Sequence, residues 1–145
     1  MFRHLSLIVF LSLFLVSNAH ARTVTDMTGR RVVIPDRIER VVGLSPPATY
    51  LIYAIDPNLL VGLSSPLRGD ERFYTVDRFK SLPVVGGIAG ESRNIHVETL
   101  LKVKPDIVIL WELKRQDMNA INRKYEQVLK PLGIPILYLS MGSVN

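Results

Sequence analysis

The stretch that most constrains the fold is residues 97–110, V-E-T-L-L-K-V-K-P-D-I-V-I-L. Apolar residues at helical spacing predict a short helix with one buried stripe, formed by Leu100, Leu101 and Val103. Pro105 lacks a backbone donor and disfavours helical geometry at the residue before it, so the helix should end there. Residues 107–110, I-V-I-L, then follow without a polar interruption. Such a run is typical of a strand that is covered on both faces, as in a parallel sheet.

Similar apolar runs alternate with helical patterns along the rest of the chain. Residues 23–26 and 31–34 predict a hairpin with a glycine at its turn, and residues 68–81 predict a long surface loop or a single helical turn. Further strands are expected at residues 40–44, 59–63, 83–85 and 134–139, and further helices at residues 48–55 and 116–132. In the helix at residues 48–55, Leu51, Ile52 and Ile55 lie on one apolar side. This alternation predicts an α/β lobe with a parallel sheet and a short N-terminal hairpin.

The first 21 residues have the pattern of a cleaved signal peptide. Arg3 supplies a positive charge, residues 5–16 form an apolar core, and Ala19-His20-Ala21 is a small-x-small cleavage site. The apolar core is shorter than the roughly 20 residues of a membrane-spanning helix. We therefore expect export of a mature chain, residues 22–145, which forms one domain.

The amino-acid composition indicates the compartment in which the protein acts and excludes some classes of partner. The chain has no cysteine, so neither a disulfide nor a lipid-modified cysteine is possible, and the simplest destination is the bacterial periplasm. Lys and Arg number 18 against 13 Asp and Glu, but the basic residues are scattered without a run. Nucleic-acid binding is therefore not indicated, and we expect a monomer with a solvated basic surface.

Small and hydroxyl residues follow the predicted strands. In open parallel sheets, ligands bind outside the carboxyl ends of the strands, so these residues form a candidate rim, although small residues are also ordinary in turns. The candidates at the strand ends are Ser45, Pro46, Ser64, Ser65, Gly86, Gly87, Trp111, Glu112, Ser140 and Met141.

Enzymatic and metal-binding patterns are poorly supported. No G-x-S-x-G surrounds any serine, no phosphate-binding loop is present, and His96 is the only histidine of the mature chain. A metal site needs several converging ligands, and a lone histidine more often caps or packs. We therefore expect no enzyme activity, no cofactor and no metal ion bound by the protein's own side chains.

Five segments follow one another along the mature chain: V-T-D-M-T-G-R-R-V-V-I-P, R-V-V-G-L-S-P, L-P-V-V-G-G, the central V-E-T-L-L-K-V-K-P-D-I-V-I-L, and L-G-I-P-I-L-Y-L. In this order they resemble the periplasmic substrate-binding proteins of ABC importers, of the iron-chelate and cobalamin type. The resemblance implies two α/β lobes joined by a long helix, with the ligand held between them. On this resemblance we expect residues 22–145 to be the N-terminal lobe alone, without the linking helix and the second lobe.

The chain departs from the family pattern at two helix starts. The first helix usually opens with a hydroxyl-x-x-Thr-Glu pattern, and here Tyr50 stands in place of the acid. His96 stands where Asn or Ser commonly precedes the central helix, and its ring is a poorer N-cap.

The resemblance implies a binding module that delivers a chelated metal to an inner-membrane permease. A ferric siderophore is the first expectation, with haem, cobalamin or a nickel chelate as alternatives. Arg68 is a candidate partner for an anionic chelate, or else an exposed loop charge, and Trp111 is a candidate stacking surface, or else a packing residue. The candidate ligand contacts are Ser45, Pro46, Ser65, Arg68, Tyr74 and Trp111.

A second implied role is permease docking by Glu98 at the start of the central helix. An acid in the first turn is also simply favoured by the helix dipole. The rival hypothesis is a small exported α/β hydrolase that uses Asp106 or Glu112 as a base.

Overall fold

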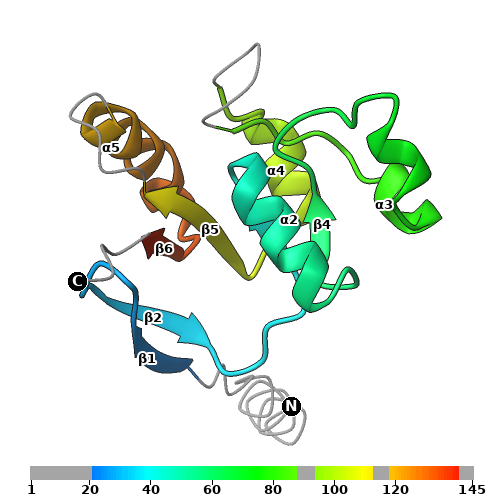
Figure 1. Ribbon diagram of the computed structural model, residues 1–145. Coiled ribbons are helices and arrows are strands. Elements are labelled where there is room, and N and C mark those ends of the chain that lie inside the picture. Colours follow the sequence, from blue (N-terminus) through cyan, green and yellow to red (C-terminus); the bar gives the residue numbers. More distant parts are fainter. Residues whose placement is uncertain (1–20, 88–93, 113–117, 141–145) are drawn as a thin grey trace, which may run out of the picture.

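The computed structural model describes residues 21–87, 94–112 and 118–140, and the predicted signal peptide lies outside the described residues. Its elements follow the predicted alternation of strands and helices (Figure 1). The strands are β1 (Ala21–Thr25), β2 (Arg31–Pro35), β3 (Val41–Gly43), β4 (Leu60–Gly62), β5 (Ile107–Glu112) and β6 (Ile136–Ser140). The helices are α2 (Pro46–Ile55), α3 (Asp77–Lys80), α4 (Val97–Val103) and α5 (Met118–Leu129), with 3-10 turns at Glu71–Phe73 and Lys130–Leu132.

The main sheet is parallel, as predicted, in the order β4-β3-β5-β6. The predicted strand at residues 83–85 is a single parallel bridge between Val84 and Leu63, beside β4. The separate antiparallel pair of β1 and β2 is the predicted hairpin, in which Gly29 adopts a positive φ of 84° at the turn.

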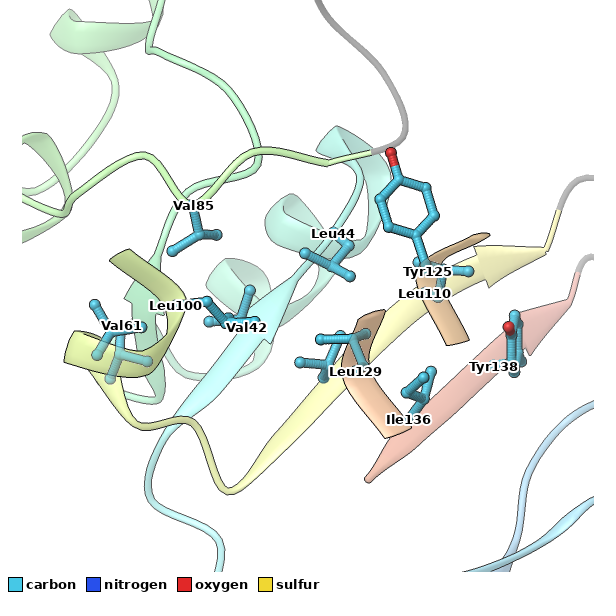
Figure 2. Packing of buried hydrophobic residues seen from close by; sticks show 12 residues of the cluster. Val42, Leu44, Val61, Val85, Leu100, Leu110, Tyr125, Leu129, Ile136 and Tyr138 are labelled. Atoms are coloured by element: carbon cyan, nitrogen blue, oxygen red, sulfur yellow. The ribbon is translucent and has the colours of Figure 1, made fainter. Parts of the chain in front are cut away.

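The sheet is buried on both faces. On one face, α4 and α5 pack on the strands, and Figure 2 shows Leu129 of α5 beside Ile136 of β6. On the other face, a second cluster joins Ile52 of α2, Phe79 of α3 and Ile34 of the hairpin to the sheet. Ile107 belongs to this second cluster and Val108 to the first, which explains the uninterrupted apolar run of β5.

The central helix and strand form as predicted, with one difference. Leu100 and Val103 are buried, but Leu101 is 48% exposed, because a helix of two turns presents only a narrow stripe to the sheet. Lys104 ends the helix with a φ of 42°. Arg40 then covers the helix end, since its guanidinium donates to the carbonyl oxygens of Val103 and Lys104 at 2.7–3.0 Å.

Helix α2 begins two residues earlier than the pattern predicted. Ser45 is its N-cap and Pro46 its first residue, and proline is well suited to that position. The buried face contains Ala48, Thr49 and Ile52, whereas Ile55, expected on the buried side, is 72% exposed.

The hairpin turn covers the outer edge of β6. Met27 N donates to Tyr138 O at 3.2 Å, Tyr138 N donates to Asp26 Oδ2 at 3.3 Å, and Arg30 Nη2 donates to Ile136 O at 3.0 Å. The hairpin therefore pairs part of an edge that would otherwise be open to other strands.

Candidate functional site

The carboxyl ends of the four parallel strands define the candidate site. The chain leaves β3 by α2 toward β4, and it leaves β5 by α5 toward β6, so the connections diverge between β3 and β5. Ligands of open α/β sheets bind at such a point. The residues after β3 and β4 and the end of β5 therefore form the candidate rim.

Ser45 lies on this rim but its side chain is committed to the fold. It is buried, and its Oγ accepts a hydrogen bond from Ala48 N at 3.4 Å as the cap of α2. Pro46 is half-buried beside it. A ligand at this point would meet the half-buried edge of Pro46 more readily than the Ser45 hydroxyl.

A buried hydroxyl pair holds the loops after β3 and β4 together. Thr49 Oγ1 lies 3.0 Å from Gly43 O and 3.2 Å from Ser64 Oγ. The backbone of Gly87 packs onto the same loops, because a Cβ atom there would come within 2.3 Å of Leu44 O. These contacts pack the loops after β3 and β4 and the backbone at Gly87 into one continuous floor of the rim.

Ser65 lines a small crevice on this floor, together with Pro46, Thr49 and Tyr50. The crevice has a volume of about 10 Å³, which is room for about one water molecule. Among the described residues, the rim is thus a surface with a small notch, without an enclosed ligand cavity.

Tyr50 and Glu71 bring the loop after β4 against α2. Burial and the hydrogen bond with Glu71 raise the pKa of Tyr50 to about 12. The same carboxylate accepts a hydrogen bond from Arg68 N at 2.7 Å. The backbone of the loop is therefore held at Arg68, whose side chain is exposed.

The two predicted aromatic contacts lie in different surroundings. Tyr74 is 86% exposed on the loop after β4, and the neighbouring Phe73 is equally exposed. Trp111 is half-buried on β5, with Leu139 of β6 as its register partner. Trp111 is therefore neither fully buried nor fully exposed, so part of this residue is accessible at the end of β5.

Glu98 lies in the first turn of α4, on the side of the molecule that faces water. Its Oε1 forms an ion pair with Lys102 Nζ at 2.8 Å, and both side chains are exposed. The sequence pattern did not predict this pairing, although the spacing of four residues favours it.

Two residues considered for catalysis or metal binding, Asp106 and His96, make contacts with the backbone of neighbouring segments. Asp106 lies at the amino end of β5, where its Oδ2 accepts hydrogen bonds from the N–H groups of Glu39 and Arg40 at 2.8 Å. His96 makes no side-chain cap, and its Nδ1 lies 3.2 Å from Val84 O. Within the described ranges no group of three or more potential metal ligands comes together. The side chain of Glu112 lies outside the described residues.

Sequence reasoning missed Thr49, Tyr50 and Glu71 as parts of the rim. The available signal was Tyr50, which departs from the expected acidic residue at the start of the first helix. Its hydroxyl reaches Glu71, so an acid from the following loop lies close to the position where the family pattern has one.

Comparisons with known proteins agree with this architecture. No protein-family profile and no curated protein sequence matches the chain. Among solved structures, an ABC transporter solute-binding protein from Sulfurospirillum deleyianum is 30% identical, with a TM-score of 0.68 over 83% of this chain and 36% of that one. A periplasmic solute-binding protein from Veillonella parvula is 27% identical, with a TM-score of 0.57 over 86% of this chain and 37% of that one.

More distant structures share the fold but differ in ligand. The molybdate-binding protein MolA of Haemophilus influenzae is 22% identical, with a TM-score of 0.61 over 83% of this chain and 35% of that one. Further matches include a siderophore-binding protein of Thermobifida fusca and the haem-binding protein HmuT. All of these are described as binding proteins, and none as an enzyme.

The chain spans little more than a third of the length of these proteins. No helix among the described residues is both long and apolar enough to cross a membrane. In sequence and fold, the chain thus corresponds to one lobe of the periplasmic solute-binding proteins of ABC transporters, which confirms the family resemblance.

Proposed function

We propose that the chain is the N-terminal lobe of a periplasmic receptor that binds a chelated metal and hands it to an inner-membrane permease. A ferric siderophore is the favoured ligand, and haem, cobalamin and nickel chelates are the alternatives. The proposal includes removal of residues 1–21 on export and action as a monomer. The observation that carries it is the rim at the carboxyl ends of a parallel sheet whose fold matches solute-binding proteins over 83% of the chain.

Two features of the rim support an anionic, partly flat ligand. Arg68 is exposed while its backbone is held by Glu71, so a charged group is offered on a fixed loop. A guanidinium can bind carboxylate, hydroxamate or catecholate oxygens in pairs. Trp111 offers a partly exposed ring on the neighbouring part of the rim, and ring stacking suits aromatic or macrocyclic ligands.

The shape of the rim indicates weak binding by this lobe alone. The crevice of about 10 Å³ cannot enclose a chelate, so the ligand would keep one side in water. Ligand pockets usually cover most of the ligand surface. A site that is micromolar with two walls would fall toward millimolar with one, a loss of about 4 kcal/mol.

The fluorescence of Trp111, the single tryptophan, tests this proposal. Titration with a ferric hydroxamate, a ferric catecholate, haemin and cyanocobalamin should give saturable quenching by one class at about millimolar concentration. Arg68→Ala should weaken binding of an anionic chelate about tenfold, whereas Arg72→Ala, a second exposed arginine of the same loop, should not. Quenching by none of these ligands would contradict a chelate site, and sub-micromolar binding would contradict the need for a second wall.

The proposed permease contact is Glu98. The carboxylate is exposed at the start of α4, and Lys102 is its partner in the free lobe. An exposed pair at this spacing contributes only about 0.3–0.5 kcal/mol. Glu98 can therefore leave Lys102 and pair with an arginine of the permease at a small cost in free energy.

Variants of this pair separate docking from helix stabilisation. Glu98→Gln should lower association with permease-containing membrane vesicles and leave ligand binding unchanged. Lys102→Met, which frees the carboxylate, should maintain or raise association, and Glu39→Gln, at another exposed ion pair, should have no effect. If Glu98→Gln and Glu39→Gln associate equally well, the docking assignment is wrong.

A further inference from the structure

A second hollow lies at the end of the sheet opposite the rim. It is a groove of about 660 Å³ between β2 and the segment that leads into β6. Its apolar lining comes from Val32, Val33, Ile134, Pro135 and Ile136, and its charged lining from Arg30, Arg31, Glu126 and Lys130. The groove is far larger than the crevice on the rim, and the ligand site proposed above does not use it.

One wall of the groove is the outer edge of β2. In an antiparallel pair, residues alternate between those bonded to the partner strand and those whose N–H and C=O point away from it. Asp26 N donates to Arg30 O at 2.9 Å, so Asp26 and Arg30 are a bonded pair. By the same register, Val24 and Val32 are the next hydrogen-bonded pair. Arg31 and Val33 lie at the non-hydrogen-bonded positions between such pairs, so their N–H and C=O groups point away from β1.

These outward groups are open in the described structure. No hydrogen bond joins the main chain of Arg31 or Val33 to any described residue outside the β1–β2 pair. The side chain of Val33 is also 60% exposed. An unpaired strand edge of this kind can accept a further strand from another chain.

The charges around the edge select the kind of strand. Arg30 already shares its guanidinium with Asp26 and Glu126. Arg31 and Lys130 are exposed, and neither has an ion pair with a described residue. Two free cations beside an apolar floor complement a strand that carries carboxylates and apolar side chains in alternation.

We propose that the outer edge of β2 binds an extended acidic peptide segment of a partner protein as a third strand beside the hairpin. The outward N–H and C=O groups of Arg31 and Val33 pair with the peptide main chain, as in other cases of strand addition. Arg31 and Lys130 bind its carboxylates. A second copy of this chain is the poorer occupant, because its β2, R-V-V-I-P, offers no acid to these cations.

The test uses fluorescence anisotropy of a short labelled peptide of alternating glutamate and valine. It should bind the whole chain, whereas the lysine–valine peptide and a backbone N-methylated version should bind at least about tenfold more weakly. Val33→Pro removes one outward N–H and should weaken binding about tenfold, while Val33→Thr keeps that group and should bind normally.

Charge variants keep the test decisive if Val33→Pro fails to fold. Arg31→Glu and Lys130→Glu should each weaken binding, and Arg72→Glu, the same change outside the groove, should not. Equal binding of the N-methylated peptide, or of the lysine peptide, would overturn the proposal. A dimer of the chain in sedimentation that Val33→Pro dissociates would assign the edge to a second copy and would also overturn it.

Discussion

The carboxylate of Asp26 offers the sharpest test of how the hairpin is held to the sheet. Its side chain is 1% exposed, and it accepts hydrogen bonds from Thr28, Arg30 and Tyr138 at 2.7–3.3 Å. Burial raises its pKa, but these hydrogen bonds outweigh burial and lower the pKa of Asp26 from 3.8 to about 2. The ionised carboxylate of Asp26 is therefore stabilised in the folded chain relative to the unfolded chain.

The size of the effect follows from the pKa difference. A shift from 3.8 to about 2, at about 1.4 kcal/mol per unit, gives about 2 kcal/mol of folding free energy. Because the folded pKa is the lower one, this contribution is present above about pH 4 and is lost as the pH falls toward about 2. Asp26→Asn should therefore cost about 2 kcal/mol at neutral pH, and the difference from wild type should shrink below about pH 4.

Urea unfolding at a series of pH values measures this prediction directly. Asp36→Asn, which alters an exposed carboxylate at the far end of β2, is the matched control and should unfold like the wild type at every pH. A constant difference between wild type and Asp26→Asn from neutral pH to about pH 2.5 would refute the assignment of the acid-sensitive stability to this carboxylate.

Two further predictions concern the floor of the rim. Gly87→Ala should lower the free energy of unfolding by about 1–3 kcal/mol, because the new Cβ would come within 2.3 Å of Leu44 O. Gly69→Ala is the control and should be nearly neutral, because the space around Gly69 is open. Equal changes in the melting temperatures of the two variants would refute this packing. Tyr125→Phe should lower the free energy of unfolding by about 1–3 kcal/mol, because the buried Tyr125 hydroxyl donates a hydrogen bond to Gly87 O at 2.8 Å. Tyr74→Phe, which alters an exposed ring, is the control and should not change the midpoint of urea unfolding. Both floor variants should also weaken chelate binding.

Much of the fold could be predicted from local chemistry. Pro105 and the run after it fixed the end of α4 and the start of β5, because proline and uninterrupted apolar residues leave few alternatives. The burial of single helical positions was less predictable. Leu101 and Ile55 are exposed because short helices turn only a narrow stripe toward the sheet, and the rotation of that stripe depends on tertiary packing.

The position of the candidate rim follows from the sequence pattern, but the contacts within it do not. The rim followed from the carboxyl ends of parallel strands, but its internal contacts join residues distant in sequence. The Tyr50–Glu71 hydrogen bond and the Thr49–Ser64 contact have no local signature. The commitment of Ser45 to capping α2 could have been predicted, because serine directly before two prolines is a strong helix start.

The most direct test of the central claim is where a metal chelate contacts the lobe. Amide chemical shifts of the labelled chain, recorded with a gallium-loaded siderophore in place of the paramagnetic ferric form, report this contact residue by residue. The account predicts shifts concentrated at the carboxyl ends of the strands, at Ser65, Arg68 and Trp111. Shifts concentrated at the opposite end, around Arg31 and Ile134, or no shifts at millimolar chelate, would contradict it.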